Sequence, residues 1–429
     1  MIVEIRKGLD IQMINLIRGF KDILPEEAGI WQHIEKTARM IFEDFGFSEI
    51  RLPILERTDL FSRSIGEDTD IVEKEMYTFS DRKGDLITLR PEATASAVRS
   101  YIQHKLYAVD PIQKLYTIGP MFRRERPQKG RYRQFYQMNA EIFGIDSPYI
   151  DAQLIYVLMV FFLRLNVTDI SPHINSLGCL ECRPKFKDAL LAFLSGKTDQ
   201  LCTDCKRRKD KNPLRVLDCK VLSCQESLDD APATLDHLCD KCQSHFEKVK
   251  YILEKINVEF VVDKRLVRGL DYYTRTTFEI QTGSLGAQSA VAGGGRYDNL
   301  VKILGGPDTP AIGFAIGLDR LVEIVDLKKD VYEKRLNVFI AALGERSREA
   351  AIEWACALGN TDVSVEIDFS ERSLKGLMKR ADRLKAEFVL IVGDKELEEK
   401  SVLLRNMKTK EQVSLPIEGI VEHIRKSIS

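Results

Sequence analysis

A run of arginines and glutamines lies between two β-prone segments, and these residue types suit the binding of phosphate. The runs 112–118 and 133–143 are rich in β-branched and aromatic residues, and the sequence Arg126-Pro-Gln-Lys-Gly130 between them is typical of a loop. We therefore expect a hairpin. Arg123 is the candidate phosphate ligand, because an arginine fixed on a strand end binds phosphate oxygens bidentately and keeps its charge. The alternative is a solvated basic hairpin whose charges pair with nearby acids.

Further segments contain polar residues or glycines where a ligand could bind. Glu92 and Thr94 come just before an expected helix, which places a carboxylate and a hydroxyl near its first turn. The segment 266–280 has an arginine, an aspartate and two tyrosines ahead of an alternating strand. Three glycines at 293–295 would let a ligand approach the backbone closely. A glycine-containing apolar strand then leads into a helix that carries Arg320.

Each of these residues also has a purely structural interpretation. Glu92 alone could be an acid near the N-terminus of the helix that follows it. Tyr272 and Tyr273 could be ordinary residues of a sheet. Only the combination of segments favours a ligand site over these alternatives.

Taken in this order, the segments resemble the class II aminoacyl-tRNA synthetases, and within that class the histidyl-tRNA synthetase family. The hairpin is similar to motif 2, the helix and strand that end at Pro53 to motif 1, and the segment 313–321 to motif 3. The sequences Arg268-Gly-Leu-Asp-Tyr-Tyr273 and Gly293-Gly-Gly-Arg-Tyr297 are similar to two signatures of the histidine enzymes. The resemblance extends from Leu16 to the C-terminus.

The resemblance implies a histidine–tRNA ligase. Such an enzyme joins the carboxylate of histidine to the α-phosphorus of ATP with loss of pyrophosphate, and then transfers histidine to the terminal ribose of tRNA(His). The protein contributes mainly positioning and stabilisation of phosphate charge. By their matching positions, Arg123 would hold the α-phosphate, Arg320 the γ-phosphate end, and Arg268 would be a fixed cation against the α-phosphate. Mg²⁺ would bind the β- and γ-phosphate oxygens.

The same resemblance implies a histidine pocket and a contact with tRNA. The positions that match binding of the α-ammonium group are Glu92, Thr94 and Gln137. Those that match the imidazole contacts are Glu141 and Tyr273, with Tyr272 beside them. Such a pocket rejects aliphatic analogues, because leaving a buried polar group unpaired costs about 1–3 kcal/mol. The loop residues that would meet the acceptor end of the tRNA are Arg126, Gln128, Lys129 and Arg131.

A helix and a strand near the N-terminus must support this site. Apolar residues recur at helical spacing from Pro25 to Phe45, with acids in the first turn and Gly46 as the stop. A short strand, 48–55, follows, in which Pro53 cannot donate to a ladder and so belongs at an edge or an interface. The resemblance places this edge at the interface of a homodimer. Without the other motifs, an ordinary surface helix and edge strand would fit equally well.

Length and composition limit the protein class. The 429 residues suggest two or three domains, and 44% hydrophobic residues with a mean hydropathy of −0.19 indicate a soluble chain with buried cores. A formal net charge of −1 means that any nucleic-acid contact uses local basic surface. Neither an apolar run of membrane-spanning length nor a secretory signal is found, so we expect a cytoplasmic protein. Residues 1–12 precede the family pattern and are either an extension or the result of a start upstream of Met13.

We expect an α+β protein whose core is the antiparallel sheet of the class II synthetases, flanked by helices. Residues 1–170 and 251–327 would form this catalytic core, and residues 171–250 an inserted, helical, cysteine-rich domain. Residues 334–429 would form a C-terminal α/β domain after a charged linker at 328–334.

The C-terminal domain corresponds to the anticodon-binding domain of the resembled family. Its buried-strand candidates, separated by helical patterns, are 337–342, 363–367 and 388–392. It also has a basic helical stretch, which is either a tRNA contact or a solvated helix face. The basic residues are Arg372, Lys375, Lys379, Arg380, Arg383 and Lys385.

Eight of the nine cysteines form four close pairs in the insert. The pairs are Cys179/Cys182, Cys202/Cys205, Cys219/Cys224 and Cys239/Cys242. Each pair could fill half of a tetrahedral zinc shell, so the four pairs could supply two structural zinc sites. The alternatives are disulfides, which a reducing cytoplasm disfavours, and buried cysteines without a ligand. The resembled family has no obligatory metal here, so the grouping of ligands and the number of sites stay open. Cys356, alone in a helical pattern, is expected in the core.

Two other functions fit part of the pattern. A catalytically silent relative that regulates ATP phosphoribosyltransferase keeps the class II core, but it lacks the C-terminal domain and typically loses active-site residues. This chain retains Glu92, Arg123, Arg268 and Arg320. A pure RNA-binding module would not account for the segment 268–273.

Overall fold

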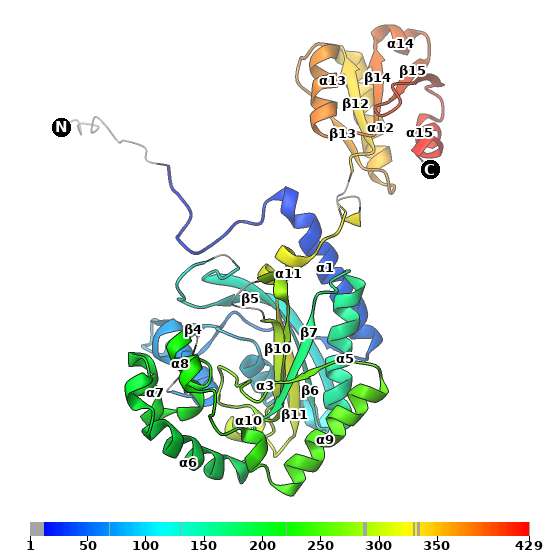
Figure 1. Cartoon of the computed structure of the whole chain (residues 1–429). Helices are drawn as coiled ribbons and strands as arrows, with labels where there is room; N and C mark the ends of the chain where they lie inside the picture. The colour runs from blue at the N-terminus through cyan, green and yellow to red at the C-terminus, as the bar shows by residue number, and fades with distance from the viewer. Residues whose placement is uncertain are drawn as a thin grey trace, which may run out of the picture. The chain divides into compact units, whose positions relative to one another are not determined.

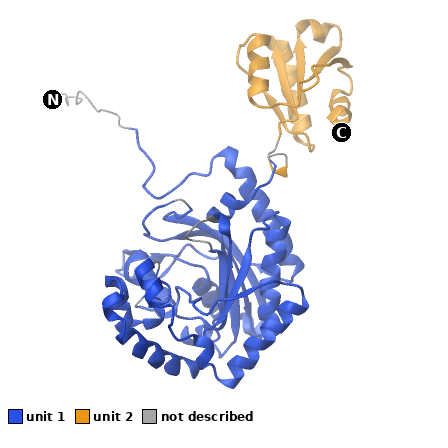
Figure 2. Cartoon of the chain, in the orientation of Figure 1, with its two compact units in different colours: residues 1–328 blue, residues 329–429 orange. Residues whose placement is uncertain are grey.

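The computed structural model describes residues 13–67, 69–128, 130–219, 221–285, 290–328, 331–332 and 335–428. The predictions for residues 1–12, for Lys129 and for part of the linker 328–334 therefore lie outside the described residues. The chain divides into two compact units, residues 1–328 and 329–429 (Figure 2). Within the described ranges, no helix has both the length and the apolar character needed to cross a membrane.

An eight-stranded sheet forms the centre of the first unit (Figure 1). Its order is β1-β5-β6-β11-β10-β9-β7-β8, and neighbours are antiparallel except for the two edge pairs, β1 with β5 and β7 with β8. The strands are β1 Ser48–Glu49, β5 Gln113–Phe122, β6 Gln134–Phe143, β7 Ser171–Ser176, β8 Val261–Val262, β9 Thr274–Gln281, β10 Ala290–Arg296 and β11 Ala311–Gly317. The expected antiparallel-rich α+β core is confirmed, and β5 and β6 form the expected hairpin.

Three helices cover one face of this sheet: α1 Pro25–Asp44, α5 Pro148–Arg164 and α9 Asp240–Lys255 (Figure 1). Proline in the first turn suits both α1 and α5, because no intrahelical bond is lost there. Apolar residues of α1 recur at helical spacing, and Phe42 packs against Phe161 of α5 and Phe314 of β11 at centroid distances of 6.2 and 5.8 Å. This core leaves the other face of the sheet for polar side chains.

The opposite face carries α3 Thr94–Gln103 and α10 Leu300–Ile303, and α4 Leu106–Val109 follows α3. A separate three-stranded sheet has the order β2-β4-β3, formed by β2 Leu55–Arg57, β4 Leu86–Leu89 and β3 Tyr77–Ser80. Helix α2 is Thr58–Ile65, a π-helix spans Ile71–Glu75, and α11 is Leu318–Ile324.

The prediction of one strand over 48–55 is wrong. Strand β1 ends at Glu49 and β2 begins at Leu55 in the other sheet, so the chain changes sheets between them. Pro53 has no N–H to continue a ladder, and Arg90 instead donates from Nη1 to the carbonyl oxygen of Leu52 at 3.0 Å.

A helical insert leaves the sheet after β7 and returns at β8; it spans residues 177–260. The predicted insert begins at residue 171, but residues 171–176 form β7, which pairs with β9. Its elements are α6 Cys182–Ser195, α7 Thr203–Lys211, α8 Leu222–Ser227, α9, and the short 3₁₀ helices Thr198–Gln200, Pro213–Val216 and Thr234–His237. Phe186, Leu190 and Leu194 of α6 pack on Val216 and Cys224 in a small core of their own.

The second unit is a five-stranded sheet of order β13-β12-β14-β15-β16 with helices. Its strands are β12 Val338–Leu343, β13 Val365–Ile367, β14 Phe388–Gly393, β15 Ser401–Asn406 and β16 Gln412–Pro416. Its helices are α12 Glu345–Gly359, α13 Leu374–Arg383, α14 Asp394–Glu398 and α15 Ile420–Ile428. Strands β13, β12 and β14 are parallel. β12 and β14 agree with two of the predicted buried strands, whereas β13 begins two residues later than predicted and is only partly buried.

The prediction that Cys356 belongs to the core is wrong, because its side chain is exposed. Ala351, Trp354 and Leu358 form the buried stripe of α12 at spacings of one and two turns. Cys356 lies two residues from both Trp354 and Leu358 and therefore points away from that stripe.

Candidate active site

Strand β6 divides its side chains between the core and the site. Met138, Ala140 and Ile142 belong to the helix-covered core, so Glu141 points to the opposite face, beside α3. In the ladder, Glu141 faces Gly313 of β11. A Cβ on Gly313 would lie 1.7 Å from Oε2 of Glu141, so glycine is what leaves room for the carboxyl group.

Two hydroxyl groups donate to the carboxyl group of Glu141. Thr94, at the start of α3, donates to Oε1 at 2.7 Å, and Tyr297 donates to Oε2 at 2.5 Å. Glu141 is 2% exposed, and this burial raises its pKa to about 8, although both hydroxyl groups lower it. The site thus contains a buried carboxyl group that can change its protonation when a polar ligand binds.

A cluster of buried tyrosines borders this carboxyl group. The rings of Tyr272 and Tyr273 are 4.8 Å apart, and Tyr272 lies 5.7 Å from Tyr297. Burial raises the pKa of all three, with the nearby Glu141 adding to the shift, so their hydroxyl groups stay neutral near pH 7. Tyr297 is not among the site residues predicted from the sequence, although it ends the signature 293–297, which is the signal that could have found it.

Glu92 and Gln137 differ in the hydrogen bonds that their side-chain oxygens accept. Glu92 accepts hydrogen bonds from the backbone N–H groups of Thr94 at 2.6 Å and Ala95 at 2.9 Å, so it does hold the first turn of α3. A carboxylate has further lone pairs, which leaves it able to bind a cation. Oε1 of Gln137 is buried and has no hydrogen-bond partner among the described residues. An unpaired buried acceptor suits a ligand that brings donors.

Arg123 and Arg268 are both fixed by the surrounding protein. Arg123 donates from Nε to the carbonyl oxygen of Pro91 at 2.9 Å, and its guanidinium lies over the ring of Phe135. Arg268 forms an ion pair with Glu279 of β9. Sequence reasoning missed Glu279, because one acid in an alternating strand gives no signal by itself.

The backbone of β10 helps to position the guanidinium groups of Arg268 and Arg320. A Cβ on Gly293 would lie 2.5 Å from Nη1 of Arg268, so the guanidinium lies directly on the β10 backbone. Arg320 on α11 donates from Nη1 to the carbonyl oxygen of Ala290 at 2.6 Å. Burial lowers the pKa of Arg320, and the charge of Arg131 lowers it further.

The hairpin loop carries the residues expected to meet tRNA. Gln128 and Arg131 close it with mutual backbone hydrogen bonds of 3.2 and 2.9 Å, and Arg131 pairs with Glu125 at 3.1 Å. Arg126 and Gln128 are exposed, and Lys129 lies outside the described residues. The basic stretch 372–385 belongs to the second unit, where Arg380 pairs with Glu366 and Asp368.

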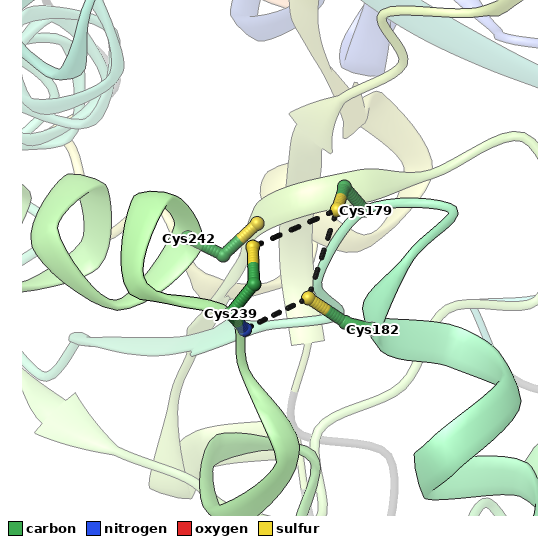
Figure 3. A group of neighbouring side chains, drawn as sticks. All are labelled: Cys179, Cys182, Cys239 and Cys242. Carbon is green, nitrogen blue, oxygen red and sulfur yellow. Dashed lines mark hydrogen bonds between the residues drawn. The ribbon is translucent and has the colours of Figure 1, made fainter.

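The eight cysteines of the insert gather into two groups of four. The outer cysteine group joins the first pair to the last, Cys179, Cys182, Cys239 and Cys242, and Figure 3 shows its sulfurs turned toward one another. The inner cysteine group joins the two middle pairs, Cys202, Cys205, Cys219 and Cys224. Within each group all sulfurs lie within 4.8 Å of one another.

The sulfur geometry suits a tetrahedral ion better than a disulfide. The sulfur of Cys179 lies 3.6 Å from that of Cys182 and 3.9 Å from that of Cys239, and the sulfurs of Cys202 and Cys219 are 3.9 Å apart. A tetrahedral zinc with Zn–S bonds of about 2.3 Å has sulfurs about 3.8 Å apart, whereas a disulfide bond is about 2.05 Å long. The donor set therefore fits zinc.

Comparisons with known proteins point to one family. The family model described as histidyl-tRNA synthetase matches residues 19–321, and the model described as anticodon binding domain matches residues 337–427. A histidine–tRNA ligase of Desulfosudis oleivorans is 63% identical over 94% of this chain and 96% of its own. A histidine–tRNA ligase of Desulforapulum autotrophicum is 62% identical over 97% of this chain and 98% of its own.

A solved structure supports the same assignment at the level of the fold and the sequence. The crystal structure of apo S. aureus histidyl-tRNA synthetase matches with a TM-score of 0.80 and 35% identity, over 96% of this chain and 100% of that one. The family model covers well over half of the sequence, and the relatives cover nearly all of it. The chain therefore belongs to the histidyl-tRNA synthetase family of aminoacyl-tRNA ligases.

Proposed function

We propose a division of labour among the site residues for the reaction of this family, in which histidine is activated with ATP and transferred to tRNA(His). The observation that carries the proposal is the buried carboxyl group of Glu141, flanked by tyrosines. Fixed arginines at 123, 268 and 320 accompany it. Such a pocket offers hydrogen-bond acceptors and neutral donors to an imidazole ring and cations to phosphate.

The histidine subsite would use two sets of groups. Glu141 accepts a ring N–H, and the hydroxyl group of Tyr273 meets the other ring nitrogen, with Tyr272 packed beside it. The α-ammonium group would bind to Glu92, Thr94 and Gln137. The unpaired Oε1 of Gln137 supports this role, since it has room for one more donor.

The activation step needs little from the protein beyond charge and position. A carboxylate oxygen of histidine attacks the α-phosphorus, a new O–P bond forms, and the bond to pyrophosphate breaks. Arg123 and Arg268 stabilise the negative charge on the α-phosphate oxygens, and Arg320 holds the γ-phosphate. Mg²⁺ on the β- and γ-phosphates would neutralise charge on the leaving group. A ribose hydroxyl of the tRNA then attacks the acyl carbon, and AMP leaves.

Gly313→Ala is expected to raise the KM for histidine about tenfold or more. The new Cβ would lie 1.7 Å from Oε2 of Glu141 and 2.8 Å from the carbonyl oxygen of Ala140, so the carboxyl group must move and lose its bonds to ligand. Losing one such charged contact corresponds to about tenfold in affinity. Histidine-dependent pyrophosphate exchange measures this KM.

Gly317→Ala is the matched control on the same strand. A Cβ there would come no closer than 3.9 Å to its nearest neighbour, so its KM should equal that of the wild type. Equal KM values for the two variants would contradict the role of Glu141 as a histidine ligand.

We further propose that the protein contacts the acceptor end of tRNA through Arg126, Gln128, Lys129 and Arg131.

We also propose that the protein works as a homodimer in the cytoplasm. Ile54 and Leu55, at the end of the segment 48–55, are 41% and 45% exposed, which supports an interface at this segment. Light scattering of the purified protein would test the dimer.

We also propose that each cysteine group holds one structural zinc ion. The spacing of the sulfurs supports this, as do backbone N–H groups that donate to thiolates: Cys239 N to Cys182 Sγ at 3.1 Å and Cys202 N to Cys224 Sγ at 3.0 Å. Zinc bound by four thiolates has no open position for a substrate, so the ions would stabilise the insert.

Cys202→Ser is expected to lower the zinc content from about two to about one ion per chain and to lower the Tm. The inner cysteine group loses a ligand, while the outer group keeps all of its own. Metal analysis and thermal unfolding measure both effects. Cys356→Ser is the control, because Cys356 is exposed and belongs to neither group, and it should change neither quantity. Unchanged zinc in Cys202→Ser would show that Cys202 is not a ligand.

A further inference from the structure

The segment Arg268–Tyr273, called here the recognition loop, has a backbone that no strand supports. Its residues form turns, bends and irregular backbone ahead of β9. Buried carbonyl groups outside a ladder need donors from elsewhere. For this loop donors come from the helical insert, from Arg183 and Arg215, which lie 88 and 53 positions away in sequence from the residues that accept.

Arg183 supplies donors to the end of the loop. From the first turn of α6, its Nη1 donates to the carbonyl oxygen of Asp271 at 3.4 Å, and its Nη2 donates to that of Tyr273. Both acceptors are backbone atoms on either side of Tyr272. The guanidinium of Arg183 therefore fixes the path of the chain that presents the two tyrosines.

Two further insert residues contact the start and the middle of the loop. Arg215, in the 3₁₀ helix Pro213–Val216, donates from Nη1 to the carbonyl oxygen of Arg268 at 3.2 Å. Asn212, which precedes it, donates from Nδ2 to Oδ1 of Asp271 at 3.0 Å. On the other side of the loop, the N–H of Asp271 donates to the carbonyl oxygen of Ile65 at 3.1 Å. The loop thus lies between the insert and the end of α2.

The two cysteine groups lie next to these three contacts. Arg183 directly follows Cys182 of the outer cysteine group, while Asn212 and Arg215 lie in the chain between Cys205 and Cys219 of the inner group. The outer group also adjoins the strand after the loop, because the N–H of Arg275 donates to the carbonyl oxygen of Gly178 at 2.8 Å. Each cysteine group therefore flanks a segment that contacts the loop.

Ion pairs hold the insert against the neighbouring segment. Arg208 pairs with Asp70 at 2.7 Å, and Arg207 and Lys211 pair with Glu73 at 3.4 and 3.3 Å. Burial raises the pKa of Asp70, but Arg208 and Arg215 lower it more, so Asp70 stays ionised. These partly exposed pairs contribute modestly to stability.

We propose that the insert positions the recognition loop for histidine binding, and that Arg183, Asn212 and Arg215 are its positioning residues. The inference rests on the proposed role of Tyr272 and Tyr273 in the histidine subsite. None of the three residues needs to touch substrate. They act by holding the backbone that orients Tyr273 and Arg268, and a shift of about 1 Å at such groups is enough to lower the rate strongly.

Arg183→Ala is expected to raise the KM for histidine in pyrophosphate exchange about tenfold, with a much smaller change in the KM for ATP. Its zinc content and Tm should stay near those of the wild type. Arg183→Lys should recover part of the affinity, because an ammonium group can donate to one of the two carbonyls. Arg207→Ala is the matched control, since Arg207 pairs with Glu73 instead of the loop, and its histidine KM should be unchanged.

Asn212→Ala gives a second and milder test. It removes one donor to Asp271 and should raise the histidine KM about threefold. A histidine KM in Arg183→Ala and Asn212→Ala equal to that in Arg207→Ala would overturn the proposal. So would a loss of activity that only follows a loss of folded, zinc-containing protein. A wild-type enzyme without histidine-dependent exchange would instead contradict the proposed function itself.

Discussion

Arg268→Ala is expected to lower the rate of histidine-dependent pyrophosphate exchange by about 10²–10³-fold, the effect typical of removing one group that stabilises developing charge. The ion pair with Glu279 and the direct approach to the backbone of Gly293 hold the guanidinium rigidly, so it needs no reorganisation when charge develops on the α-phosphate. The loss should appear mainly in kcat, because the charge is greatest in the transition state.

Two variants control this experiment. Arg268→Lys keeps a positive charge but loses the planar fork, so it should recover only part of the rate. Arg164→Ala removes an exposed arginine in the last turn of α5, away from the site and from the proposed dimer interface, and it should leave the rate unchanged. A rate for Arg268→Ala within a few-fold of that of Arg164→Ala would remove Arg268 from the proposed catalytic residues.

Glu141→Gln is expected to raise the KM for histidine about 10- to 100-fold, because an amide offers one acceptor where the carboxylate offers two. Thr94 and Tyr297 already donate to both oxygens of Glu141, so the NH₂ group of the variant would also face a hydroxyl donor. The same variant should change the pH profile of histidine affinity.

The sign of that pH effect follows from the pKa of Glu141. Burial raises this pKa to about 8, so below that pH and without histidine the carboxyl group is mostly protonated. A ring N–H of histidine requires the ionised acceptor, so binding releases a proton, and affinity should rise with pH until it levels off above 8. Free histidine itself titrates near pH 6.5, but this affects the wild type and Glu141→Gln equally. It therefore cancels in the ratio of their affinities for histidine. A constant ratio of affinities between pH 6.5 and 9 would contradict this assignment.

The sequence predicted local elements well, because each depends on a pattern within a few residues. Strands β5 and β6, helix α1 and the three parallel strands of the second unit all follow from periodicity and turn residues. Strand 48–55 was predicted too long, since the change of sheet near Pro53 depends on Arg90, a residue distant in sequence. Cys356 was misplaced because a single cysteine does not reveal which side of α12 is buried.

Sequence patterns did not predict which residues distant in the chain contact each other. The spacing of the cysteines indicated pairs but left open that the first pair joins the last, because that depends on how α6 and α9 fold back. The bond from Tyr297 to Glu141 and the pair of Arg268 with Glu279 each join separate strands or loops. The residues that the resemblance named do include Thr94 and Glu141, whose side chains meet in the structure.

Pyrophosphate exchange with ATP and Mg²⁺, measured for histidine against the other amino acids, tests most directly whether this site activates histidine. We expect exchange with histidine alone and its loss in Arg268→Ala, with zinc content unchanged. Exchange with another amino acid, or none from folded protein, would contradict this expectation.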